Sequence, residues 1–191
     1  MTGQSTGNGQ AWRVFLVEDN AVVRRGIHLL VGFEPDLVVC GEAEDADEAF
    51  AQICDLRPDL AIVDLALKES SGLDLIPRLH VECPQVRILV LSMHDQPRWI
   101  ELALQAGAEG YLTKDESPDQ LIRAIRQVLE GKRFLSQRGL ARLGGKCGVD
   151  WLMPSQAGNP SGPLEHPPAP RTDNPPASPP DLPLPLPPRS G

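Results

Sequence analysis

The sequence predicts a parallel α/β domain, and three observations support this fold class. Short apolar runs alternate with amphipathic stretches from residue 12 to residue 132. One of these runs, "LAIV" at 60–63, is apolar throughout, which is typical of a strand buried on both faces of a parallel sheet. Helices between successive strands supply the right-handed crossovers that parallel strands need. We therefore expect a doubly wound, five-stranded sheet with helices on both faces.

Each element is expected from its own residues. The strands are short apolar runs: 12–17, 36–43, 59–65, 86–93 and 109–114. The helices carry apolar residues at helical spacing: 20–30, 45–57, 72–82, 95–106 and 117–131. Asn20 is expected to cap the first helix, and Pro58 to stop the second. Ser117 caps the fifth, with Pro118 at the first helical position and Gln120 completing a capping box.

The composition changes outside this domain. Residues 1–11 form a polar lead that we expect to be disordered, and 133–153 form a linker remnant with room for one more helical turn. Residues 154–191 hold 14 of the 20 prolines. Proline removes amide donors, so this tail is expected to be disordered, with polyproline II character. Its "LPLPLPP" stretch is either passive, the favoured interpretation, or a ligand for an aromatic-lined groove.

Charge and composition exclude several classes of protein. A formal net charge of −8 argues against a general nucleic-acid-binding surface, which needs a basic stripe. The N-terminus has no signal-peptide core, and no apolar run approaches the roughly 20 residues of a membrane span. The four cysteines show no metal-ligand spacing, and buried thiols are expected rather than disulfides. These features predict a soluble, cytoplasmic protein.

Polar residues gather where the expected strands end. Glu18 and Asp19 follow the first strand, Asp64 ends the third, Ser92 the fourth and Lys114 the fifth. Because ligands bind at the carboxyl ends of parallel strands, we expect these side chains at one rim of the sheet. Three clustered carboxylates repel one another and attract a cation, and oxygen ligands suit Mg²⁺. Taken singly, each residue has a simpler interpretation as a loop acid, turn cap, strand terminator or surface lysine.

Asp64 is the candidate nucleophile of this group. An unpaired carboxylate in an apolar core is costly, so its place beside "LAIV" calls for a partner or a metal. Attack of Asp64 on a phosphorus centre fits the neighbouring groups. A metal and Lys114 would neutralise the developing charge, and Ser92 would bond a phosphoryl oxygen.

Four segments carry a resemblance to a known family. "VEDN", "IVDLALKESSGLDLI", "VLSMHD" and "AGAEGYLTKD" resemble the receiver domain of two-component response regulators. They are most similar to the subfamily with a helix-turn-helix output, typified by nitrate-response and nodulation regulators. The resemblance covers residues 12 to about 136. It implies a flavodoxin-like sheet of order 2-1-3-4-5.

The resemblance also implies roles for the metal site. Asp64 would accept a phosphoryl group from a sensor histidine kinase or phosphotransfer protein, with Mg²⁺ as cofactor. Asp19 and Asp64 would bind the ion directly. Glu18 would act through water, and the backbone carbonyl of Ala66 would supply a further ligand.

Further implied roles concern the switch. Lys114 would complete the site, and Ser92 and Tyr111 would form the pair that responds to phosphate. The face of the fourth helix, fifth strand and fifth helix would then change, for signalling to a downstream protein. The protein would be a phosphoacceptor with slow autodephosphorylation, and not an enzyme acting on other substrates. Ala66 leaves access for water, whereas His94 either shields the phosphate, interacts with it or has no role, so the phosphate lifetime stays open.

Downstream of the resemblance the chain departs from the subfamily. "GKRFLS" usually leads to a DNA-binding domain, whereas here Gly- and Pro-rich sequence follows, without three amphipathic helices or a basic face. Specific DNA binding is therefore not expected. The alternatives are a single-domain regulator acting by protein contact and a truncated or frameshifted relative of a transcription factor. Homodimerisation through apolar stripes on the first and fifth helices is also open, the other alternative being that the sheet covers those stripes.

Other functions fit less well. A phosphatase of the haloacid dehalogenase type would place a second Asp two residues after its nucleophile, where this chain has Ala66. A flavodoxin-like flavin binder would need a hydroxyl- and Gly-rich phosphate loop, where this chain has "VEDNAVV". A full transcription factor would need the helix-turn-helix that is not seen here.

Overall fold

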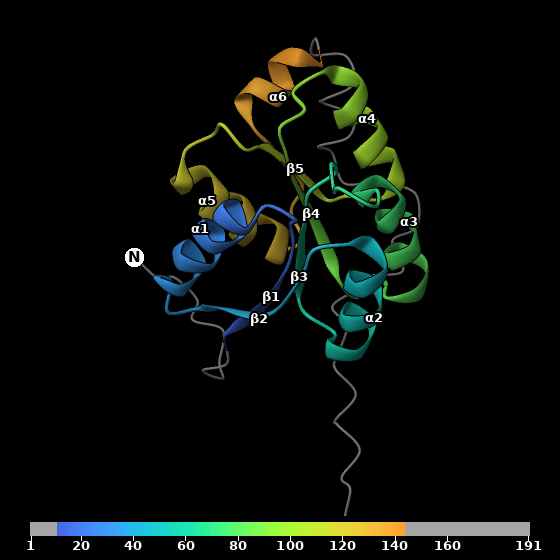
Figure 1. Ribbon diagram of the computed structural model, residues 1–191. Coiled ribbons are helices and arrows are strands. Elements are labelled where there is room, and N and C mark those ends of the chain that lie inside the picture. The colour runs from blue at the N-terminus through green and yellow to red at the C-terminus, as the bar shows by residue number, and fades with distance from the viewer. Residues whose placement is uncertain (1–10, 144–191) are drawn as a thin grey trace, which may run out of the picture. The chain divides into compact units, whose positions relative to one another are not determined.

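The computed structural model describes residues 11–143, which form a parallel sheet between two layers of helices (Figure 1). The sheet has the order β2-β1-β3-β4-β5-β6. Every neighbouring pair of strands is parallel. The strands are β1 Trp12–Val17, β2 Leu37–Ala43, β3 Leu60–Val63, β4 Arg87–Ser92, β5 Gly110–Thr113 and β6 Phe134–Leu135. The predicted fold class and strand order are confirmed, but the predicted count of five strands misses β6.

The helices divide between the two faces of the sheet. They are α1 Ala21–Gly32, α2 Ala46–Leu56, α3 Gly72–Glu82, α4 Pro97–Ala106, α5 Pro118–Leu129 and α6 Gln137–Arg142. Buried residues of α2, α3 and α4 pack into one core cluster, and those of α1 and α5 into the other. Figure 1 shows the same separation across the sheet. Among residues 11–143, no helix is long and apolar enough to cross a membrane.

Strand β3 lies in the interior, as its apolar sequence predicts. All four of its residues are buried. Leu60 and Ile62 belong to the cluster under α1 and α5, whereas Ala61 and Val63 belong to the cluster under α2, α3 and α4. This alternation explains why the strand is apolar at every position.

The predicted cap of α1 is confirmed, whereas the predicted capping box of α5 is not. Asn20 caps α1 as expected, since its Oδ1 accepts hydrogen bonds from the backbone N–H groups of Val22 and Val23 at 3.0 and 3.3 Å. Ser117 precedes α5 with Pro118 at the first helical position, but its side chain makes no capping bond. The Gln120 backbone N–H donates instead to the Ser117 carbonyl oxygen at 2.9 Å. The predicted capping box is therefore wrong.

The described fold continues beyond the fifth helix. Phe134 and Leu135 pair with Gly110 and Tyr111 of β5, and both are buried. The additional helical turn expected from the sequence forms α6, with Leu140 packed against the core. A two-residue strand is too short to show any periodicity, so no pattern in the sequence predicts β6. The expected Pro-rich tail and nearly all of the expected N-terminal lead lie outside the described residues.

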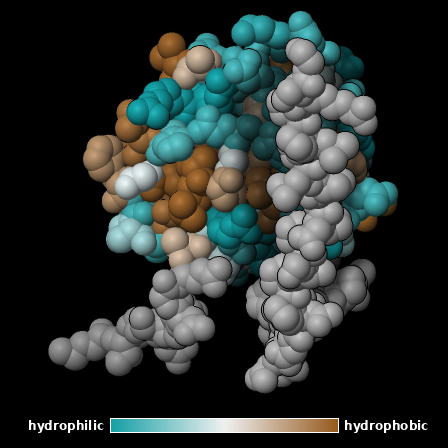
Figure 2. Space-filling view, turned by 60° about the horizontal axis from the view of Figure 1, so that its bottom comes forward, coloured by the Kyte–Doolittle hydropathy of each residue, from teal (hydrophilic) through white to brown (hydrophobic). Residues whose placement is uncertain are grey.

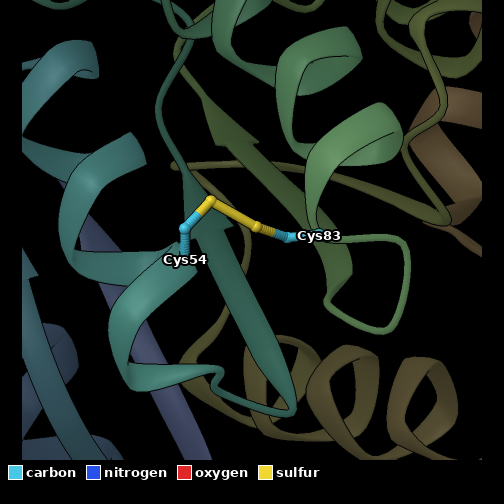
Figure 3. The surroundings of a disulfide bond; sticks show 2 residues. All are labelled: Cys54 and Cys83. Atoms are coloured by element: carbon cyan, nitrogen blue, oxygen red, sulfur yellow. A yellow bond between two sulfur atoms is a disulfide. The ribbon is translucent and has the colours of Figure 1, made fainter.

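A disulfide links α2 to the end of α3. Cys54 is bonded to Cys83, the residue that follows α3 (Figure 3). The expectation that these cysteines are thiols is therefore wrong, because the fold brings their Cα atoms to 6.0 Å, a separation that disulfides span. Cys40 is a thiol, and burial raises its pKa.

Apolar side chains are unevenly covered. Large brown areas are visible on the face shown in Figure 2, which brings the bottom of Figure 1 forward. The apolar stripe of α5 is buried against the sheet. In contrast, Val22 and Leu29 of α1 are exposed, and so is Phe33, which follows α1. The predicted stripe of α1 around Ile27 packs against the core, so the sheet covers the stripes of both helices and leaves a separate apolar edge of α1 exposed.

Glu109 is a partly buried acid at the opposite end of β5 from the rim where the polar residues gather. Its Oε2 accepts a hydrogen bond from the Ile88 backbone N–H at 2.7 Å. Burial raises the pKa of Glu109, and this hydrogen bond offsets only part of the effect. A raised pKa means that the folded state holds the proton more tightly than the unfolded state does. The stability contributed by Glu109 is therefore present at low pH and is lost as pH rises through its folded pKa.

We accordingly expect Glu109→Gln to increase the free energy of unfolding relative to wild type more at about pH 7 than at about pH 4. Glutamine keeps an oxygen for the Ile88 amide but carries no charge at either pH. Urea unfolding at both pH values measures the difference. A constant difference across that range would show that Glu109 does not titrate differently in the folded and unfolded states.

Candidate functional site

The rim at the carboxyl ends of the strands brings together the acids predicted from the sequence. Glu18 and Asp19 follow β1, and Asp64 follows β3. Carboxylate oxygens of these three residues lie within 4.8 Å of one another. Glu18 and Asp64 are only 2% and 4% exposed. Three acids this close, two of them buried, are stabilised by a cation nearby.

Lys114 supplies one positive charge to the cluster. Its Nζ lies 2.6 Å from Glu18 Oε2 and 2.7 Å from Asp64 Oδ2. Burial by itself lowers the pKa of Lys114, but the hydrogen bonds and charges of Asp64 and Glu18 outweigh it and raise the pKa above its ordinary value. Lys114 is therefore held in its charged form between two carboxylates.

Glu18 is fixed by its backbone and its side chain. Its N–H donates to the Ala43 carbonyl at 3.1 Å, which extends the β1–β2 ladder by one residue. Its Oε1 accepts a hydrogen bond from the Asn20 N–H at 3.1 Å. Burial raises the pKa of Glu18, and the bond to Lys114 opposes this shift without cancelling it. A second cation would therefore lower the cost of keeping Glu18 ionised.

The loop after β3 sets the position of Asp64. The Asp64 N–H donates to the Val17 carbonyl at 2.9 Å, and its Oδ1 accepts from the Ala66 N–H at 3.2 Å. The start of α3 presses on the same peptide, because a Cβ at Gly72 would lie 1.8 Å from the Asp64 carbonyl oxygen. Asp64 thus caps a turn, the simpler interpretation, and also takes part in the acidic cluster.

Ser92 and Tyr111 are both buried beside the site. Ser92 is fully buried, and its Oγ accepts a hydrogen bond from the His94 N–H at 3.3 Å. The Tyr111 hydroxyl donates to the His94 carbonyl at 2.6 Å, and burial raises the pKa of Tyr111 to about 12. The His94 ring stacks on Trp99 of α4, with centroids 4.6 Å apart. Residues of β4, α4 and β5 are therefore joined in one contact chain.

Sequence reasoning missed two cations that contact the acidic loop. Lys68 Nζ lies 3.6 Å from Asp19 Oδ2, and the guanidinium of Arg24 donates to the Glu18 carbonyl. Both stand near motif residues in the sequence, but neither lies at a strand end. The strand-end criterion therefore could not find them. Ala66 is exposed and pairs with Ser71 in an isolated bridge.

The chain is similar to proteins of a known family. Residues 14–126 match the model of the response regulator receiver domain family. The chain is 39% identical over 131 residues to the DNA-binding transcriptional activator DevR/DosR of Mycobacterium tuberculosis, covering 69% of this chain and 60% of that protein. It is 32% identical over 130 residues to the nitrate/nitrite response regulator NarL of Escherichia coli, covering 68% and 60%. It thus spans about 60% of the length of these relatives.

A solved structure extends the similarity to the fold. A two-component response regulator of the LuxR family from Aurantimonas sp. SI85-9A1 superposes with a TM-score of 0.68 at 32% identity. The superposition covers 71% of this chain and 97% of that one. The family match, the identity to NarL-type regulators and the shared fold all concern the part of the chain that carries the acidic rim. The chain therefore belongs to the response regulator receiver domain family, with relatives of the NarL and DevR type.

Proposed function

We propose that Asp64 is the phosphoacceptor of a phosphorelay and receives its phosphoryl group from a histidine of a sensor kinase or phosphotransfer protein. The observation that supports this most is the Lys114 ammonium, which lies within 2.7 Å of both Glu18 and Asp64. A nucleophilic carboxylate beside a fixed positive charge is suited to attack on a phosphorus centre, where negative charge gathers on the phosphoryl oxygens. Since sensor kinases use intracellular ATP, the proposal places the protein in the cytoplasm.

In the proposed transfer, an oxygen of Asp64 attacks the phosphorus of a phosphohistidine. The new O–P bond forms as the N–P bond breaks, and the electron pair of that bond returns to the imidazole nitrogen. Lys114 stays near the phosphoryl oxygens and offsets their charge. Ser92 donates its hydroxyl to one of those oxygens after it moves toward the site. Water would later reverse the modification slowly, as an acyl phosphate hydrolyses.

Glu18, Asp19 and Asp64 fit a magnesium ion. Their oxygens are hard ligands that already converge within 4.8 Å, and Glu18 and Asp64 are buried with fewer cations than acids around them. In the proposal, Asp19 and Asp64 bind the ion directly, Glu18 through water, and the Ala66 carbonyl adds a backbone ligand. Bound Mg²⁺ would neutralise charge on the incoming phosphoryl group.

The proposed output is a change in the α4–β5–α5 face. Ser92 and Tyr111 form the switch pair, and the bond from Tyr111 to the His94 carbonyl links the β4–α4 loop to β5. The Ser92 hydroxyl accepts a hydrogen bond from the His94 N–H, so movement of Ser92 toward a phosphate would displace His94. This displacement would disturb the hydrogen bond from Tyr111 to the His94 carbonyl. We propose that the changed face binds a downstream protein. Pairing of two receivers is the second candidate, favoured by the exposed Val22 and Leu29 of α1.

The test of the phosphoacceptor is intact mass after incubation with acetyl phosphate and Mg²⁺. Wild type is expected to gain one phosphoryl group, and Asp64→Asn is expected to gain none. Asp55→Asn is the matched control, since Asp55 is an exposed acid on α2, and it should be modified like wild type. Chelation of Mg²⁺ should also prevent the adduct. An adduct that persists in Asp64→Asn would assign the phosphoryl group to another residue.

A further inference from the structure

We infer that Arg24 is a positioning residue for the metal site: its guanidinium fixes the peptide that carries Asp19, and its removal weakens Mg²⁺ binding. The inference rests on the proposed function, because it concerns the same acidic cluster. Arg24 touches neither the expected metal position nor the phosphoacceptor. It acts through the backbone of the β1–α1 loop.

The contact with that loop is direct. Arg24 NH1 donates to the Glu18 carbonyl oxygen at 2.6 Å. The side chain is only 16% exposed, although it is charged and lies on a helix at the surface. Its backbone N–H also donates to the Asn20 carbonyl at 2.9 Å, so the helix start holds the residue close to the loop. Hydrogen bonds from a charged donor to a carbonyl are stronger than neutral ones.

Two acids hold the guanidinium in this orientation. Arg24 Nε lies 3.2 Å from Glu42 Oε2, and NH2 lies 2.7 Å from Glu44 Oε1. Glu42 also contacts His28 of α1. All three nitrogens of the planar guanidinium are therefore engaged. A rigid fork anchored at two points cannot rotate away from its third partner.

The Glu18 carbonyl matters because it shares a peptide with Asp19. The Glu18 oxygen and the Asp19 nitrogen belong to one planar unit, so fixing the oxygen fixes the direction in which the Asp19 Cα leaves β1. The Glu18 N–H is held on its other side by Ala43. Within the described part of the chain, the Asp19 carboxylate has one charged partner, Lys68, whose side chain is 75% exposed. Lys68 Nζ also donates to the Asp19 carbonyl oxygen, but at 3.4 Å and from an exposed position. The placement of Asp19 thus depends on its backbone, whose preceding peptide Arg24 holds at 2.6 Å.

A shift of Asp19 would cost metal affinity. The three carboxylates can share one ion because their oxygens converge within 4.8 Å. Partners that orient metal ligands typically contribute 10- to 100-fold in affinity, and we expect Arg24→Gln to weaken Mg²⁺ binding by about tenfold. Arg24→Lys keeps one donor for the Glu18 carbonyl but loses the planar fork of the guanidinium. Its Mg²⁺ affinity should therefore lie between those of wild type and Arg24→Gln.

The experiment is calorimetric titration of the full chain with MgCl₂. The matched control is Arg25→Gln, the same substitution at the next residue, whose side chain is exposed. Arg25→Gln should bind Mg²⁺ like wild type. The acetyl phosphate reaction gives a second measurement: Arg24→Gln should need more Mg²⁺ for half-maximal rate yet reach the wild-type rate at saturation. A merely structural role would instead lower the saturated rate or the urea midpoint without changing the Mg²⁺ requirement.

The outcomes separate this inference from the proposed function. Wild type that binds Mg²⁺ but forms no adduct contradicts the proposed function, while the affinity of Arg24→Gln still decides the role of Arg24. An adduct in wild type together with unchanged Mg²⁺ affinity in Arg24→Gln contradicts the positioning role alone. If Arg24→Gln does not fold, the Mg²⁺ affinity of Arg24→Lys decides. A wild-type affinity in Arg24→Lys would then overturn the inference. Wild type that binds no Mg²⁺ overturns both.

Discussion

Replacing Lys114 by methionine is expected to lower the free energy of unfolding by about 3–5 kcal/mol in buffer free of divalent cations. The ammonium lies 2.6 and 2.7 Å from Glu18 and Asp64, and all three side chains are nearly buried. Methionine has a similar length but no charge, so it leaves two buried acids with no counter-ion between them. Protonation of Glu18, whose pKa is already raised by burial, will offset part of this loss of stability.

Magnesium should reduce the deficit of Lys114→Met, because a second cation can take the place of the first between the carboxylates. Urea unfolding with chelator and with MgCl₂ measures both values. Lys132→Met is the matched control: its ammonium lies 2.6 Å from Glu130 Oε2, but both side chains are mostly exposed. Such a pair is worth under about 1 kcal/mol. Equal losses in the two variants would mean that the Lys114 pairs are as well solvated as a surface pair.

Reduction of the Cys54–Cys83 disulfide is expected to lower the free energy of unfolding by about 3–4 kcal/mol, from the loop entropy released in the unfolded chain. The two cysteines are 29 residues apart, and the loop between them includes β3 and all of α3. Reduction adds only two hydrogens and removes no side-chain atoms from the core, so it leaves no cavity. The expected loss therefore comes from the unfolded chain.

The disulfide prediction is checked by unfolding wild type with and without a reductant. The double variant Cys54→Ala, Cys83→Ala is the control, since its unfolding should not respond to the reductant. Peptide mapping under non-reducing conditions identifies the linked pair. Wild-type unfolding that is insensitive to reductant, in protein shown to contain the bond, would contradict the loop-entropy estimate.

Most of the site could be predicted because its residues sit where strands end. Parallel strands place their carboxyl ends on one rim, so Glu18, Asp64, Ser92 and Lys114 needed only the strand boundaries to be brought together. The buried position of β3 could also be predicted, because a strand that is apolar at every position is typical of the middle of a sheet covered on both faces.

The features that sequence reasoning missed depend on contacts between distant segments. Cys54 and Cys83 are close only because α2 and α3 lie side by side. Arg24 finds Glu42 and Glu44 only because β2 lies next to β1. No spacing along the chain encodes either approach. Strand β6 was missed for another reason, because two residues are too few to show a periodic pattern.

The ladder from β1 through β3 and β4 to β5 also determines when the site can exist during folding. Lys114 meets Asp64 across 50 residues of chain, and Arg126 meets Asp36 across 90. A nascent chain that has formed β1 and β3 but not β5 would hold three converging acids without Lys114, and their repulsion would oppose the partial sheet. Such non-local closure slows folding. The complete acidic cluster, with Lys114 between Glu18 and Asp64, thus exists only in a chain that has been synthesised and folded at least through β5.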